Sequence, residues 1–268
     1  MLGMIKSEIY KLFNKKSFYV CALILMGLAG LGAWFFENTY FQRLGIPVIE
    51  GAMKQMGFTA WDAVRYGAGF DNIIIMNSIF SSIFVCYEFS SGMNKNLVIR
   101  GKNKLIMYFS KMLVSMLIPI VYTILAAITS YAISSHLWDS GKWEESYVNS
   151  IVIPICLFIL VQMVYQSIFV MIGYLSKSSG WATAINFSIS SLILPVIVIG
   201  GINYVLNSWF GIKESIDKYW PGNGFVNIYE YEYPLKAEHA KIFPWVLIAY
   251  FVIPAIVGSF VFWKREVK

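Results

Sequence analysis

The sequence predicts an all-α membrane protein with six transmembrane helices and an N-terminal amphipathic elbow helix. Of its 268 residues, 58% are hydrophobic and only 13% are charged, about half the charge of an ordinary soluble domain. The apolar residues also come in runs that can cross about 30 Å of hydrocarbon as a helix. The expected spans are 17–36, 70–87, 107–134, 150–174, 182–204 and 243–263.

The positions of lysine and arginine predict that both ends of the chain lie in the cytoplasm. With the N-terminus inside, the inner segments carry 13 basic and 3 acidic residues, and the outer segments carry 8 basic and 12 acidic residues. The inner side is then +10 and the outer side −4, a bias that disfavours the inverted topology. We expect a multi-pass protein of a bacterial cytoplasmic membrane, with residues 1–268 forming one domain.

Residues 4–16 precede the first span and predict an amphipathic helix. Apolar residues recur on one side of it, and charged residues take the other side. The apolar set is Ile5, Ile9, Leu12 and Phe13, and the charged set is Lys6, Glu8, Lys11 and Lys15. Such a helix lies on the inner leaflet, either as a topology anchor or as an elbow that also contacts a cytoplasmic partner.

The loop between spans two and three, residues 88–106, is the most informative cytoplasmic segment. Residues 94–100 predict a short helix, and Gly101 ends it in the manner of a C-cap. Leu97 and Val98 give this helix an apolar face beside basic residues. Composition alone favours a plain positive-inside loop, whereas the short helix indicates a docking site for a soluble partner.

The chain lacks the groups that a self-sufficient transporter or enzyme needs. Proton- and sodium-coupled carriers usually hold an intramembrane carboxylate, but Asp71 and Glu88 lie at span ends, and Lys111 is expected to snorkel to the inner surface. No GxxxxGK[S/T] loop occurs, and His136 and His239 lie far apart in outer loops. We expect no catalytic residue, no metal and no cofactor in this chain, and an energy source in another subunit.

The loop opens with Glu88 and continues with Gly92, Lys95, Leu97 and the basic Arg100, and Lys111 follows at the start of span three. This pattern resembles the first cytoplasmic loop of ABC-2-type exporter permeases. The elbow helix, the six spans, the short 175–181 loop and the long outer stretch before span six are also similar to that family. Met93 stands where threonine is frequent, and no proline precedes Arg100, so the length of the coupling helix stays open. The matching positions are Glu88, Gly92, Lys95, Leu97, Arg100 and Lys111.

The resemblance implies the ABC-2 (type V exporter) transmembrane-domain architecture and its partners. Two permease copies, as a homodimer or a closely related heterodimer, each sit in the lipid membrane on a separate ABC ATPase that uses ATP and Mg²⁺; no nucleic acid is involved. Glu88 would hold the junction of elbow helix, span two and loop, and residues 175–181 would form a smaller second contact. The implied coupling residues are Glu88, Gly92, Lys95, Leu97, Arg100, Gly101, Lys102, Lys111, Ser176 and Lys177.

The resemblance also implies a dimer seam at spans two and five, where polar side chains gather. Interhelical hydrogen bonding is the alternative interpretation of these side chains. The aromatic stretch 205–242 is expected to form re-entrant or outer helices over the exit, or a plain interfacial loop. The candidates for the translocation path or seam are Asn77, Ser78, Ser81, Gln162, Gln166, Asn186 and Ser190.

These features favour the permease subunit of an ATP-binding cassette exporter for a hydrophobic or amphipathic substrate. The small size and many aromatic residues fit export of an antimicrobial or cytolytic peptide, such as a lantibiotic or a peptide of the phenol-soluble-modulin type. Drug or sodium efflux by the same family is the nearest alternative. A membrane scaffold or sensor that binds a soluble partner is the second, and an intramembrane hydrolase, for which no nucleophile–base pair is evident, is the third.

Overall fold

The computed structural model describes residues 2–44, 59–66, 70–138, 140–143, 145, 147–211, 216–221 and 237–264. These residues are helices joined by turns, which confirms the all-α fold class. The helices are α1 (Leu2–Phe13), α2 (Lys16–Leu44), α4 (Ala60–Tyr66), α5 (Phe70–Ser90), α6 (Met93–Ile99), α7 (Lys104–Ser115), α8 (Leu117–Leu137), η1 (Val148–Val152), α9 (Ile153–Ser176), α10 (Ser179–Ser190), α11 (Ile193–Phe210), η2 (Ile216–Tyr219) and α13 (Ala237–Lys264).

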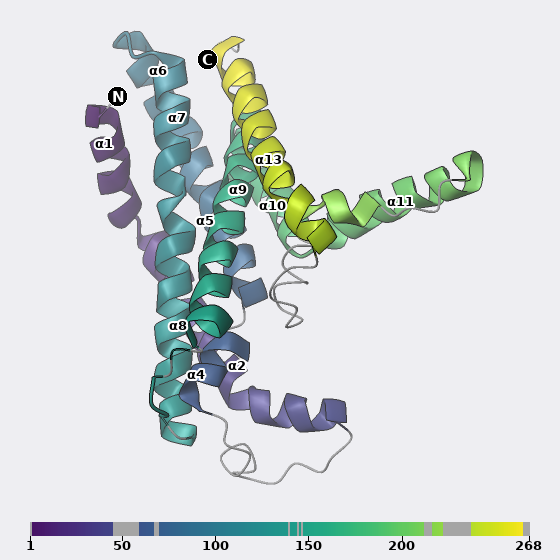
Figure 1. Ribbon diagram of the computed structural model, residues 1–268. Coiled ribbons are helices and arrows are strands. Elements are labelled where there is room, and N and C mark those ends of the chain that lie inside the picture. Colours follow the sequence, from purple (N-terminus) through teal and green to yellow (C-terminus); the bar gives the residue numbers. More distant parts are fainter. Residues whose placement is uncertain are drawn as a thin grey trace.

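The two ends of the described chain and α6 lie at one end of the helical bundle (Figure 1). The short helix α4 lies at the opposite end, beside the C-terminal part of α8 (Figure 1). We call the first of these the α6 end of the bundle. The predicted topology places the loop 88–106 and both termini on the same side of the membrane, and it therefore requires this arrangement.

Five segments of the described residues are long and apolar enough to cross a membrane, or six if the bent pair of α1 and α2 counts as one. This finding supports a multi-pass membrane protein. Most observed helices extend a few residues beyond the predicted spans, because helices continue past the hydrocarbon into the headgroup region. The five segments are Asn72–Ser90, Lys104–Leu137, Val148–Ser176, Ile193–Phe210 and Lys241–Lys264.

The predicted elbow helix is α1, which begins at Leu2 and ends at Phe13. Its axis is bent by 56° from the first part of α2. At the bend, the Tyr19 hydroxyl donates a hydrogen bond of 2.8 Å to the Phe13 carbonyl, which the broken helix leaves free. Before the bend, α1 packs along α7 (Figure 1), so one side of α1 contacts protein.

The structure breaks the predicted fifth span, 182–204, into two helices. The 12 residues of α10 rise about 18 Å, less than the hydrocarbon thickness, and α11 leaves the bundle sideways (Figure 1). Leu192 has a φ of 61°, in the left-handed region, at the break. The Ser190 and Ser191 hydroxyls bond back to the Phe187 carbonyl, a contact that bends helices, and hydrophobic length alone does not reveal it.

Aromatic side chains fill the core at the α6 end. Tyr108, Tyr174 and Phe262 are buried against one another, and the Tyr108 hydroxyl donates to the Pro254 carbonyl at 3.3 Å. Here α9 approaches α5 closely at Gly173, where an added Cβ would lie 2.7 Å from Val85 Cγ1. The core therefore ties α5, α7, α9 and α13 together directly below α6.

Candidate functional site

The short helix α6 is held by chain turns at both ends. Gly92 precedes it with a φ of 68°, and Gly101 follows it with a φ of 73°. The Gly101 N–H donates to the Val98 carbonyl at 2.9 Å, and the Lys102 N–H donates to the Leu97 carbonyl at 3.1 Å. This pair of bonds is a Schellman motif, so the C-cap that the sequence predicted is confirmed. The helix runs from Met93 to Ile99, one residue earlier at each end than expected.

The two faces of α6 differ from the sequence-based prediction. Leu97 and Val98 pack against the aromatic core described above, so they anchor the helix. Ile99 is instead 72% exposed, and sequence reasoning missed it. The coupling candidates Lys95, Arg100 and Lys102 are exposed around it. The exposed surface of α6 is therefore one isoleucine surrounded by cations, a surface suited to docking.

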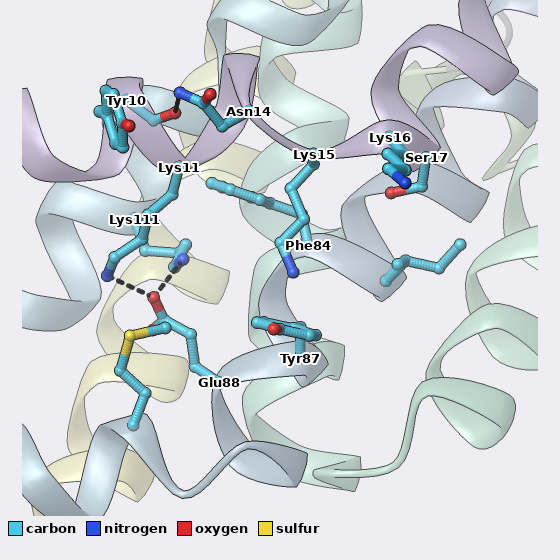
Figure 2. Close-up of a pocket in the computed structure, with 12 residues that line it drawn as sticks. Tyr10, Lys11, Asn14, Lys15, Lys16, Ser17, Phe84, Tyr87, Glu88 and Lys111 are labelled. Atoms are coloured by element: carbon cyan, nitrogen blue, oxygen red, sulfur yellow. Dashed lines mark hydrogen bonds and ion pairs between the residues drawn. The ribbon is translucent and has the colours of Figure 1, made fainter.

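Four charged side chains meet where α1, α5 and α7 come together, and Figure 2 shows three of them, Lys11, Glu88 and Lys111. The Glu88 carboxylate accepts from Lys11 Nζ and from Lys111 Nζ, both at 2.8 Å. Glu8 forms ion pairs with the same two lysines. We call these residues, Glu8, Lys11, Glu88 and Lys111, the ionic cluster. Glu88 therefore lies where α1, α5 and α7 meet, and its role in coupling stays a prediction.

The ionic cluster corrects one sequence-based prediction and adds one residue. Lys111 was expected to snorkel to the surface, but its side chain is only 1% exposed, because two carboxylates pair with it inside the protein. Glu8 was assigned to the charged side of α1, yet it is buried. Glu8 lies three residues after Ile5 and four before Leu12, so it is on their face of the helix. This spacing is the sequence signal that could have predicted its burial.

The ionic cluster can transmit motion between three helices. Two carboxylates and two ammonium groups balance in charge, which lowers the cost of burying each of them. Separating one partner would leave a buried charge unpaired, a costly state. The arrangement therefore favours movement of α1, the α5 end and α7 as one unit, and α6 follows directly from α5.

The turn between α9 and α10 lies next to this region. Lys177 has a φ of 55° and is exposed, and Ser176 is half-buried with its hydroxyl near the Gly173 carbonyl at 3.4 Å. The rings of Phe89 and Tyr174 are 5.3 Å apart, which places the end of α9 beside the end of α5. The two predicted contact segments are thus neighbours, and their role as contacts stays a prediction.

The polar side chains proposed for a path or seam, which we call the polar row, are buried inside one copy of the chain. Interhelical hydrogen bonds join them, as the alternative interpretation predicts. The row is buried within one copy in this conformation, and its place on a path or seam stays a prediction. The bonded pairs are Asn77–Gln162, Ser81–Gln166, Ser82–Asn186 and Ser78–Ser190.

Half of the aromatic stretch 205–242 lies outside the described residues. Within it, α11 ends at Phe210, and Gly211 follows with a φ of 66°. The Trp220 ring packs against the rings of Tyr165 and Tyr250. This part of the stretch is therefore attached to α9 and α13, and helices over an exit stay a prediction.

Comparison with known protein families gives a match. The family model described as "ABC-2 family transporter protein" matches residues 4–193, well over half of the chain. The matched region contains the ionic cluster, α6, the turn at residues 177–178 and the polar row. No curated protein matches the chain.

Proposed function

The chain belongs to the ABC-2 transporter family, and on this premise we propose that it couples a separate ABC ATPase to peptide export. Members of this family are membrane transport components that normally pair with an ABC ATPase. The observation that carries the proposal is α6, a capped helix with an exposed isoleucine and three exposed cations on it and just after it. Leu97 and Val98 anchor this helix on the aromatic core. ATP and Mg²⁺ would act in the ATPase, and the termini and α6 would face the cytoplasm of a bacterial cell.

Docking of the ATPase on α6 is tested by co-purification. Ile99→Asp places a carboxylate at the centre of the proposed contact without touching the core, because Ile99 is exposed. We expect this variant to lose the ATPase. The matched control is Leu2→Asp, an 84% exposed apolar side chain at the same end of the bundle, which should retain it. Retention of substrate-stimulated ATP hydrolysis after replacing residues 92–101 by a flexible linker would overturn the docking role.

The substrate class is proposed to be an amphipathic peptide. Support comes from the apolar α11 arm and from the polar row, in which Asn77 Oδ1 and Gln162 Nε2 have no hydrogen-bond partner within the described residues. Such spare capacity suits a passage that opens to an amphipathic molecule. Reconstituted permease and ATPase would be compared with an amphipathic cationic peptide, a lipophilic drug and Na⁺. Peptide-stimulated ATP hydrolysis is expected, and stimulation by the drug or Na⁺ alone would refute the peptide assignment.

A second permease copy is proposed to pack against the α11 arm. Only 6% of this apolar arm is buried, and within the described residues it contacts chiefly α10 and η2. The test uses Val196, which is 66% exposed, as a cysteine in a Cys156→Ser background, since Cys156 is the exposed native cysteine in the described chain. Val196→Cys should form a cross-linked dimer in membranes. A cysteine at 53% exposed Tyr19 on α2 serves as the control and should stay monomeric.

A further inference from the structure

A cavity of about 550 Å³ opens at the elbow, between α1, the start of α2 and the end of α5 (Figure 2). This volume lies within the range of pockets that bind small ligands. Its wall carries both cations and apolar side chains. The cations are Lys11, Lys15, Lys16 and Lys111, and the apolar residues include Ile83, Phe84 and Met93.

The cavity carries an excess of positive charge. The ionic cluster balances Lys11 and Lys111 with its two carboxylates. Lys15 and Lys16 form no ion pair with a carboxylate in the part of the chain that the structure describes, so the local charge is +2. Burial, and then the charge of Lys111, lowers the pKa of Lys15 to about 8. Cations crowded in this way favour an anionic ligand.

The position of the cavity points to a lipid as the source of that anion. It lies where the chain turns from the elbow helix into α2, the level at which a span enters the membrane. Val20 and Ile24 follow Lys16 at intervals of four residues, so they continue its face along α2, and both are exposed. An apolar strip therefore leads from the cavity toward the hydrocarbon.

We propose that this elbow pocket binds the phosphate of an anionic phospholipid. Lys15 and Lys16 hold the phosphate oxygens, Ser17 offers its hydroxyl to the headgroup, and the acyl chains lie along Val20 and Ile24. The bound lipid neutralises the excess charge and fixes the bend between α1 and α2. This proposal is independent of what the protein exports.

The test measures lipid binding by the purified full-length chain. Unfolding temperature and native mass spectrometry would be followed with phosphatidylglycerol, phosphatidylcholine, inorganic phosphate and glycerol 3-phosphate. Phosphatidylglycerol should bind selectively. K15Q/K16Q should bind it about 30-fold more weakly, since each lysine near an anionic surface changes the affinity about fivefold. K6Q/K264Q removes the same charge from exposed lysines outside the cavity and should bind normally.

Three results would overturn the proposal. They are unchanged binding by K15Q/K16Q, equal binding of phosphatidylcholine, and saturation by inorganic phosphate or glycerol 3-phosphate at lower concentration than by phosphatidylglycerol. The last result would identify a soluble phosphate as the ligand. If K15Q/K16Q does not fold, the single variant K16Q, at an exposed position, serves instead and should still weaken binding several-fold.

Discussion

Replacing Glu88 by glutamine should destabilise the protein through the ionic cluster. The carboxylate is 4% exposed and accepts from two lysines at 2.8 Å. The neutral amide therefore leaves the buried Lys111 ammonium and the 20% exposed Lys11 side chain facing Glu8 alone. Removing one partner of a buried ion pair costs about 3–5 kcal/mol. Because Glu8 still pairs with both lysines, we expect the lower end, about 3 kcal/mol. In a chain of this size that corresponds to a fall in unfolding temperature of about 6–12 °C.

A double-mutant cycle separates this electrostatic cause from a packing defect. Lys111→Met removes the buried ammonium and keeps an apolar side chain of similar length. The variant E88Q/K111M retains Glu8 and Lys11, whose charges balance. It should therefore lose less stability than the sum of the single variants, by about 1 kcal/mol or more.

The assay is thermal unfolding of the purified protein in one detergent, read by intrinsic fluorescence. Glu145→Gln, the same substitution at an exposed outer position, is the matched control and should not change the unfolding temperature. The reasoning is refuted if E88Q unfolds with the wild type, or if the E88Q and K111M effects add fully.

Three further predictions concern backbone fit and charge. Gly173→Ala brings its new methyl group within 2.7 Å of Val85 and should lower the free energy of unfolding by about 1–3 kcal/mol, measured by thermal unfolding. Adding Val85→Ala should restore the stability. Absence of this rescue would contradict the close approach. In Gly101→Ala the new methyl group meets no atom within 4 Å, but the alanine must hold a φ of 73°. The variant should therefore lose about 1 kcal/mol of unfolding free energy and co-purify less ATPase. Gly3→Ala is the control and should change neither. Phosphatidylglycerol binding should fall between pH 7 and 9, because Lys15, with its pKa lowered to about 8, is cationic below that pH and neutral above it. Binding by the K15Q variant should not change over this range. A wild-type profile that is equally flat would contradict the prediction. The groups that face Lys15 are Lys11, Lys16, Tyr87, Glu88 and Lys111.

The sequence was sufficient for features that depend on neighbouring residues. Apart from the fifth span, which the structure breaks at Leu192, hydrophobic length identified the candidate membrane spans, because about 20 apolar residues match the hydrocarbon thickness wherever they occur. Gly101 identified the end of α6, because a Schellman motif needs only a glycine and the preceding turn. In the same way, the loop pattern beginning at Glu88 indicated the family that the comparison then showed.

Tertiary structure decided every feature that depends on helices meeting. The ion pairs join Glu88 to Lys11 and Lys111, 77 and 23 residues away, and no local periodicity encodes such distances. Ile99 is exposed because Leu97 and Val98 take the sites on the aromatic core, a competition that the core geometry settles. The sequence by itself thus determined that the chain enters the membrane and where most of its long apolar helices lie. Only packing determined which charges are buried, because burial depends on the neighbours that fold places around each side chain.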